Sequence, residues 1–100
     1  MSGDKIRIVP EVKTGLDDKN SRLIISASIP GVKKEEINII ITELNFRLSA
    51  SKGNILFEIS LPLCRRVMPH EARASYEGGH LTIEVPVKKD ANNEVKVLVD

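Results

Sequence analysis

The sequence predicts an all-β protein, an antiparallel immunoglobulin-like β-sandwich of about seven strands. Short segments of alternating apolar residues recur at intervals of about 8–12 residues, with Gly, Pro, Asn and Asp between them. The apolar residues are mostly aliphatic, with many Ile and Val, whose branched side chains suit a pleated sheet. No segment carries a helical period of useful length. An up-and-down barrel is the structural alternative.

Length and composition narrow the class of protein. A chain of 100 residues forms one domain, and its net charge of +1 and three aromatic residues give no sign of nucleic-acid or anionic-membrane binding. Cys64 is the only cysteine, so an intrachain disulfide is excluded. The N-terminus lacks a signal-peptide pattern, and no apolar run approaches the roughly 20 residues that span a bilayer. We therefore expect a cytoplasmic protein.

A hairpin near the C-terminus is the clearest local pattern. Residues 72–76 and 81–87 alternate on either side of Gly78-Gly79, where a two-residue turn requires positive φ. Pro86 has no N–H for a ladder and marks the end of the second strand or an edge position. The closing strand should bury Leu81 and Ile83 on its inner face.

The remaining strands follow from alternation and turn residues. Ile6, Ile8 and Val12 are expected on one face of a single N-terminal strand, and residues 15–21 form a polar loop. Residues 63–71 form an irregular connection. In chain order, the expected strands are residues 5–12, 22–29, 37–42, 46–50, 55–61, 72–76 and 81–87.

Four motifs in this order resemble those of the alpha-crystallin domain, the core of the small heat-shock proteins. They are IPGVKKEEI at residues 29–37, FRLSA at 46–50, ISLP at 59–62 and ASYEGGHLTIEVP at 74–86. The resemblance covers roughly residues 5–88 and implies the sandwich fold. It differs at the hairpin, where the family usually has Asn and Val in place of Gly78 and His80.

The resemblance also shapes the expected assembly. Phe57 stands where the family commonly has an arginine at the dimer contact, and residues 50–55 are too few for the loop whose strand many members exchange. By the resemblance, we expect almost none of the long N-terminal arm of most members. We therefore expect a homodimer or other small homo-oligomer, formed through a strand edge at Ile55, Phe57 and Ile59.

Residues with catalytic or metal-binding chemistry are few. His70, His80 and Cys64 do not have the spacing of a metal site. Gly78-Gly79 joins two strands rather than opening a helix, so it is not a phosphate-binding loop, and no serine lies in a nucleophile elbow. We expect no catalytic, cofactor-binding or metal site, and hence no enzyme.

Apolar residues on outward-facing positions point instead to a binding groove. The family resemblance implies a groove between the strands at residues 37–42 and 72–76, which accepts an Ile/Val-x-Ile/Val segment from a neighbour's tail. The groove residues expected here are Ile37, Ile39, Ile40, Ala74 and Tyr76. Residues 1–88 would form the domain and residues 89–100 a C-terminal extension, with Val95, Val97 and Val99 as the docking motif. The extension as an extra edge strand of the same domain is the alternative.

Two functions of different classes fit these features. The first is an ATP-independent holding chaperone of the stress response, which binds partly unfolded proteins through apolar grooves and limits their aggregation. The second is a small adaptor or co-chaperone module that binds one folded partner. A structural part of a larger assembly is a third possibility.

Overall fold

The computed structural model describes residues 6–17, 19, 21–63, 65–88 and 97–99, and the described part is all-β. The elements are β1 (Ile6–Ile8), β2 (Glu11–Leu16), β3 (Arg22–Ser28), the 3-10 turn η1 (Lys34–Glu36), β4 (Ile37–Ile41), β5 (Asn45–Lys52), β6 (Ile55–Pro62), the 3-10 turn η2 (Pro69–Glu71), β7 (Arg73–Glu77) and β8 (His80–Pro86).

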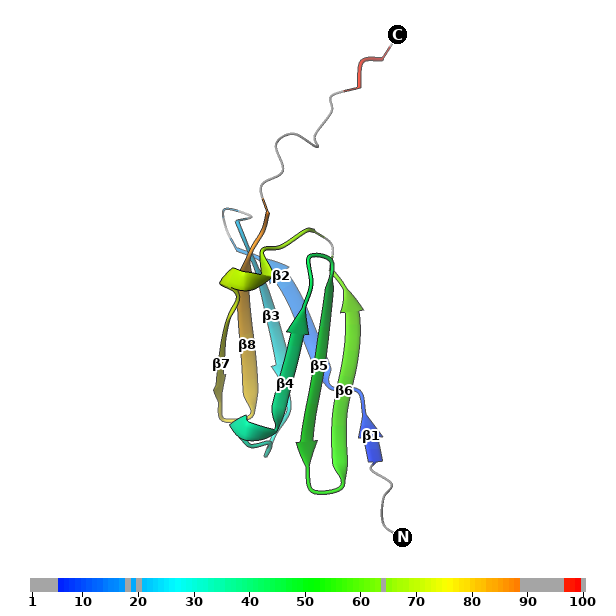
Figure 1. Cartoon of the computed structure of the whole chain (residues 1–100), viewed down its shortest axis with the longest axis vertical. Coiled ribbons are helices and arrows are strands. Elements are labelled where there is room, and N and C mark those ends of the chain that lie inside the picture. Colours follow the sequence, from blue (N-terminus) through cyan, green and yellow to red (C-terminus); the bar gives the residue numbers. More distant parts are fainter. Residues whose placement is uncertain (1–5, 18, 20, 64, 89–96, 100) are drawn as a thin grey trace.

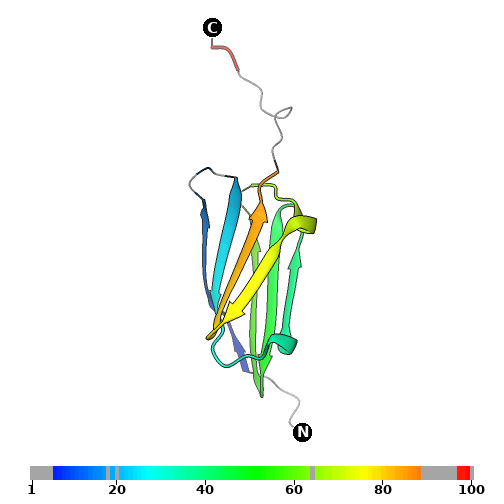
Figure 2. The ribbon, with the colours of Figure 1, turned by 90° about the vertical axis from the view of Figure 1, so that its left-hand side faces the viewer.

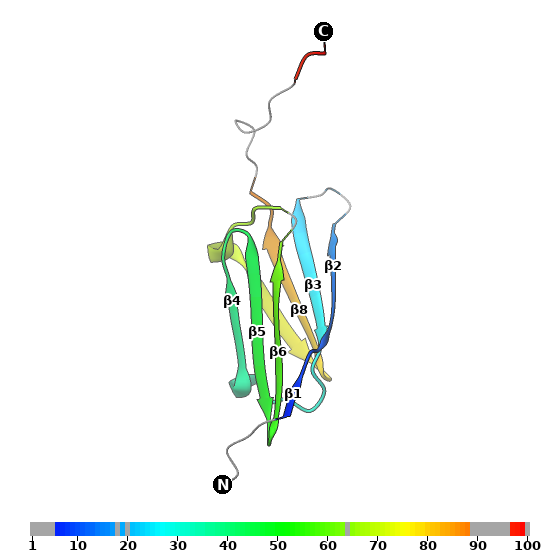
Figure 3. The same cartoon turned by 90° about the vertical axis from the view of Figure 1, so that its right-hand side faces the viewer.

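The strands form two four-stranded sheets that face each other. One sheet has the order β1-β6-β5-β4 and the other β2-β3-β8-β7, and Figures 1 and 3 show them as two layers. The two separate sheets confirm the predicted sandwich and exclude the barrel. β1 is parallel to β6, whereas the other strand pairs are antiparallel.

The hydrophobic core lies between the sheets. Side chains alternate across a strand, so every second residue of β3, β5 and β8 points inward. Burial of each large side chain contributes about 1.5–3 kcal/mol to folding. The most completely buried side chains are Phe46, Leu23, Ile25, Ile29, Leu48, Leu81, Ile83, Val67 and Val85.

The β7–β8 hairpin has the predicted two-residue turn and lies at the edge of its sheet (Figure 2). Gly78 and Gly79 have φ angles of +57° and +86°, a region that glycine enters without steric cost. The carbonyl of Gly79 accepts a hydrogen bond from the Ile29 N–H at 2.9 Å. The Tyr76 hydroxyl donates to the Ile29 carbonyl at 3.0 Å. The turn is thereby held against the end of β3.

The N-terminal segment corrects the prediction of a single strand. The chain leaves β1 at Val9, and buried Pro10 precedes β2 in the opposite sheet. Proline cannot donate to a ladder, which favours a strand break at this position. Ile6 and Ile8 therefore do not share a face with the residues of β2, and the described residues form eight strands rather than about seven.

The expected loop at residues 15–21 is shorter in the structure. Gly15 and Leu16 pair with β3 as the end of β2. The Asp17 carboxylate accepts hydrogen bonds from the Ser21 N–H at 2.8 Å and the Arg22 N–H at 3.2 Å. Burial alone would raise the pKa of Asp17, but these hydrogen bonds together lower it. Asp17 therefore organises the loop.

The connection between β6 and η2 adds two residues to the core that the sequence pattern did not identify. Leu63 and Val67 are buried, and Val67 forms an isolated antiparallel bridge with Val87. The Leu63 N–H donates to the Leu44 carbonyl at 2.6 Å. The irregular spacing of these residues hid them from a search for alternation.

A small ion network connects the β4–β5 turn to the end of β8. Glu43 lies 3.1 Å from the Lys88 ammonium and 3.3 Å from the Arg66 guanidinium. The hydrogen bond and charge of Lys88, followed by the charge of Arg66, hold the pKa of Glu43 below its ordinary value of 4.5. All three side chains are about half exposed.

The Glu43→Gln variant should lose stability in a pH-dependent way. The lowered pKa means that the ionised carboxylate favours the folded state. This contribution is complete above the ordinary pKa and disappears as the pH falls through the lowered value. Urea unfolding at pH 7 and at about pH 2–3 should therefore show a difference from wild type only at pH 7. Glu35→Gln is the matched control, and an equal difference at both pH values would contradict the prediction.

Candidate binding groove

The candidate site lies along one open side of the sandwich. β4 and β7 are the end strands of their respective sheets, so each has one edge that no described strand covers. A cavity of about 510 Å³ lies between them. Lys34 of η1 forms part of its lining.

The groove is apolar inside and charged at one end. Ile37 and Ile39 come from β4, Ala74 and Tyr76 from β7, and Leu81 of β8 also lines the cavity. The 3.0 Å hydrogen bond of the Tyr76 hydroxyl to a backbone carbonyl fixes the ring. The other residues that line the groove are Lys34, Ser75 and Glu77. Lys34 and Glu77 both lie near the start of β4 and the end of β7.

The structure brings together four of the five predicted groove residues. Ile40 is the exception, because alternation along β4 places it on the outer face of the sheet, where it is 53% exposed. The sequence pattern missed Lys34, Glu77 and Leu81 as lining residues. Leu81 was recognisable as a core position, but its access to the groove depends on how the two sheets are arranged in space.

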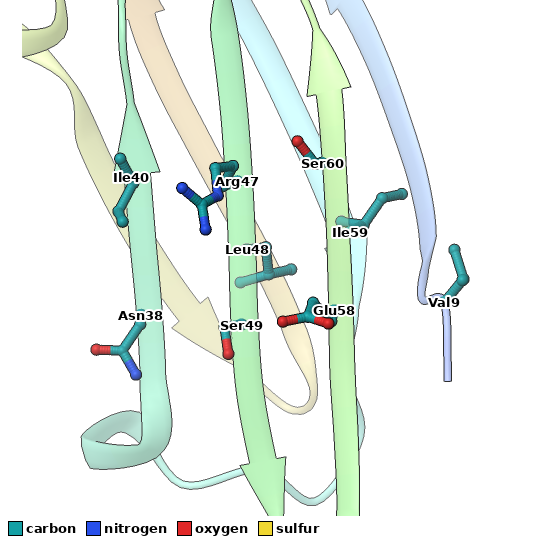
Figure 4. A pocket seen from close by; sticks show the side chains of 9 residues that line it. All are labelled: Val9, Asn38, Ile40, Arg47, Leu48, Ser49, Glu58, Ile59 and Ser60. Atoms are coloured by element: carbon teal, nitrogen blue, oxygen red, sulfur yellow. The ribbon is translucent and has the colours of Figure 1, made fainter. Parts of the chain in front are cut away.

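Ile40 lies at a second cavity, of about 500 Å³, on the outer face of β4, β5 and β6 (Figure 4). Arg47 is paired with Ile40 across β4–β5 and with Ser60 across β5–β6. Arg47 and Glu58 give this surface a polar centre. Its lining residues are Val9, Asn38, Ile40, Arg47, Leu48, Ser49, Glu58, Ile59 and Ser60.

The predicted docking motif lies partly within the described chain. Val97 and Val99 are 79% and 96% exposed, and neither belongs to a strand. Val95 lies outside the described residues. Docking of this segment in the groove therefore stays a prediction.

The predicted dimer edge requires a correction. Ile55 and Phe57 pair with Ile6 and Ile8 of β1, and Phe57 is 8% exposed. This half of β6 is therefore an interior strand position rather than an edge. Ile59 lies beyond the end of β1, in the half of β6 that pairs only with β5 among the described strands. The dimer itself stays a prediction.

The described residues contain no group of three or more His, Cys, Asp or Glu side chains that could hold a metal ion. His70 and His80 are both exposed, and Cys64 lies outside the described part of the chain. No helix within the described residues is both long enough and apolar enough to cross a membrane. The lining of the groove by Ile37, Ile39, Tyr76 and Leu81 offers apolar contact.

The fold is similar to that of solved small heat-shock proteins. Heat shock protein 16.0 of Schizosaccharomyces pombe superposes with a TM-score of 0.70 at 14% identity, covering 93% of this chain and 99% of that one. HSP18.5 of E. histolytica superposes with a TM-score of 0.72 at 15% identity, covering 92% and 99%. At this level of identity the likeness establishes the fold alone.

The chain also resembles a heat shock protein in its sequence. No protein-family model matches the chain. Heat shock protein HSP.16.4 of Streptococcus thermophilus is 28% identical over 105 residues, which cover 88% of this chain and 72% of that protein. The similarity in sequence covers most of the chain, and the chain folds as a sandwich like that of the solved small heat-shock proteins. The chain is therefore similar to a heat shock protein in sequence and to solved small heat-shock proteins in fold.

Proposed function

We propose that the chain is an ATP-independent holding chaperone that binds partly unfolded proteins through exposed apolar grooves and limits their aggregation. Small heat-shock proteins are ATP-independent chaperones and not enzymes, so the similarity of this chain to them supports this role. The single observation that carries the proposal is the groove between β4 and β7, where Ile37, Ile39 and Tyr76 are only partly buried.

The groove suits an extended apolar segment. Side chains two residues apart in an extended chain point to the same side, about 6.5–7 Å apart. The open edges of β4 and β7 add backbone groups that can pair with such a segment. Two valines buried there would contribute roughly 1.5–3 kcal/mol each, less the cost of ordering the segment. The balance is a weak, reversible contact.

We propose that the chain's own extension, residues 89–100, is one occupant of the groove, with residues 1–88 as the folded domain. Val95, Val97 and Val99 would present one apolar side to the groove of a neighbouring copy. A client or partner would then displace them. The exposure of Val97 and Val99 supports this role, because neither is committed to a sheet within the described chain.

Truncation after Lys89 should leave the sandwich folded. We expect the distribution of oligomers to shift to smaller species and binding of an apolar-surface dye to increase, because the groove loses its occupant. Light scattering and dye fluorescence measure the two effects. Unfolding of the truncated chain would show that the extension is an integral strand, and no change at all would show that it occupies no groove.

A pair of substitutions separates the groove from the outer face in the full-length chain. Ala74→Asp puts a charge into the groove at an exposed position and should reproduce the size shift of the truncation. Ile40→Asp puts the same charge on the outer face and should leave the size unchanged. A size shift with Ile40→Asp and not with Ala74→Asp would place the docking surface on the outer face of β4 and would contradict the proposal.

Suppression of aggregation tests the chaperone function directly. Increasing amounts of the protein are added without nucleotide to a heat-denatured client, and light scattering follows aggregation while the size of the protein alone is measured in parallel. We expect suppression at near-stoichiometric ratios, weakened by Ala74→Asp. Failure of the wild-type protein to suppress aggregation of several unrelated clients would refute the proposal.

The adaptor function is supported by a specific feature of the fold. β5 and β6 are joined by only Gly53 and Asn54, so there is no long loop between them to exchange with a second copy. A sandwich of this kind could bind one folded partner through a strand edge.

We propose a homodimer or small homo-oligomer in the cytoplasm for either function, and light scattering that reports a dozen or more subunits would contradict it.

A further inference from the structure

Strand β1 covers only half of the outer edge of β6. The parallel pairing begins at Ile6 with Ile55 and ends at Ile8 with Phe57, whereas β6 continues to Pro62. Figures 1 and 3 show β1 beside the beginning of β6 only. Among the described residues, none pairs with the outer edge of β6 beyond this point. The chain thus protects part of an edge and leaves the rest open.

The direction of each backbone group at this edge follows from one hydrogen bond. The Ile6 N–H donates to the Asn54 carbonyl at 2.7 Å. Backbone groups alternate along a strand, so the Ile8 N–H also faces β6 and the Arg7 N–H faces away. On β6 the same alternation points the backbone groups of the even-numbered residues, such as Ser60, toward the outer edge.

β1 is held weakly compared with the other strands. It has three residues, all of them exposed. Ile6 and Ile8 are 57% and 39% exposed, so neither contributes a buried side chain to the core. Removing β1 from β6 would therefore cost a few backbone hydrogen bonds and little apolar burial.

We propose that β1 is a removable cap on a self-association edge, and that a second copy of this chain pairs its β6 antiparallel to β6 when β1 is displaced. The inference rests on the self-association proposed above and specifies where it occurs and what controls it. The alternation of β6 makes the strand self-complementary: Ile55, Phe57 and Ile59 lie on one face, so an antiparallel copy presents apolar residues opposite apolar residues.

The position of β1 decides how many residues can pair. With β1 in place, Ser60 is the open-edge residue that offers both a donor and an acceptor, because Pro62 has no N–H. With β1 displaced, a two-fold axis at Phe57 brings Leu56 opposite Glu58 of the second copy and Ile55 opposite Ile59. No like charges are then directly opposite each other. The long pairing is available only after the cap has left.

Two proline substitutions test the cap. Ile8→Pro removes a donor that faces β6, whereas Arg7→Pro removes one that faces away. Sedimentation equilibrium should give a dimer dissociation constant at least about tenfold smaller for Ile8→Pro than for wild type, and an unchanged one for Arg7→Pro. Circular dichroism checks that both variants are folded. Equal association of Ile8→Pro and wild type, or an equal gain in both variants, would overturn the proposal.

A second substitution locates the interface. By the same alternation, the backbone N–H of Ser60 points toward the open edge and not toward β5. Ser60→Pro should therefore leave the fold intact, and in combination with Ile8→Pro it should abolish the tighter dimerisation. Association that persists in the double variant would place the interface elsewhere and overturn the proposal.

A reversible lock gives a test that does not weaken β1. Arg7→Cys with Leu56→Cys, paired residues of β1 and β6, is made in a Cys64→Ser background. The oxidised protein should associate more weakly than the reduced one, and equal association would overturn the proposal. These measurements of size are independent of client aggregation, so failure of the cap and failure of the chaperone function are distinguishable.

Discussion

Ile83→Ala should reduce the free energy of unfolding by about 2–5 kcal/mol, the usual cost of deleting a large aliphatic core side chain. Ile83 is 1% exposed at the centre of β8, where it pairs with Ile25 of β3 and Ala74 of β7. The substitution would leave a cavity between the two sheets that rigid neighbouring strands cannot close. Chemical denaturation monitored by circular dichroism measures the loss.

The adjacent residue provides the control for Ile83→Ala. Thr82 lies on the opposite face of β8 and is only partly buried. Thr82→Ala should therefore change the free energy of unfolding by no more than about 1 kcal/mol. Equal losses for the two variants would mean that the alternation of β8 does not set the core, and an unaltered stability of Ile83→Ala would show that the register of the strand is wrong.

Gly79→Ala should be the more damaging of the two glycine substitutions in the β7–β8 turn. Gly79 has a φ of +86°, and an added Cβ would lie 3.0 Å from the backbone Cα of Pro30. The new methyl group would meet the chain that follows β3, and the Ile29 hydrogen bond to Gly79 would have to shift. We expect a loss of about 2–4 kcal/mol in the free energy of unfolding.

Gly78→Ala isolates the effect of backbone conformation. Gly78 has a φ of +57°, but an added Cβ there would meet no atom within 4 Å. The expected loss is about 1 kcal/mol, the cost of placing alanine in the left-handed region. Thermal unfolding of the two variants would measure the difference. A loss for Gly78→Ala as large as that for Gly79→Ala would show that contact with Pro30 is unimportant.

Most strands could be predicted from the sequence because their signals are local. The apolar residues of β3 and β8 recur with a period of two, and a sheet with one buried face requires that period. The Gly78-Gly79 turn was equally clear, since few other residues reach its φ values. These features depend on neighbouring residues and not on how the sheets are arranged.

The groove could be predicted only through the resemblance to a family. Alternation identifies which side chains share a face of a strand, but it does not show which face is inward. Ile40 was included in the predicted groove as an outward-facing apolar residue, although alternation places it on the opposite face of β4 from Ile37 and Ile39. Lys34 and Glu77 line the groove because η1 and the end of β7 meet in space, and their distance along the chain hides this.

Strand period and turn chemistry are short-range properties, so they were enough to predict the all-β class, the hairpin and the inner residues of the central strands. Three features became visible only in the folded chain: the crossing between sheets at Pro10, the parallel pairing of β1 with β6, and the covering of Ile55 and Phe57. Parallel pairing joins segments that are distant in sequence, and its hydrogen bonds are made by backbone groups common to nearly all residues. The pattern of side chains along the sequence therefore says little about which strands pair.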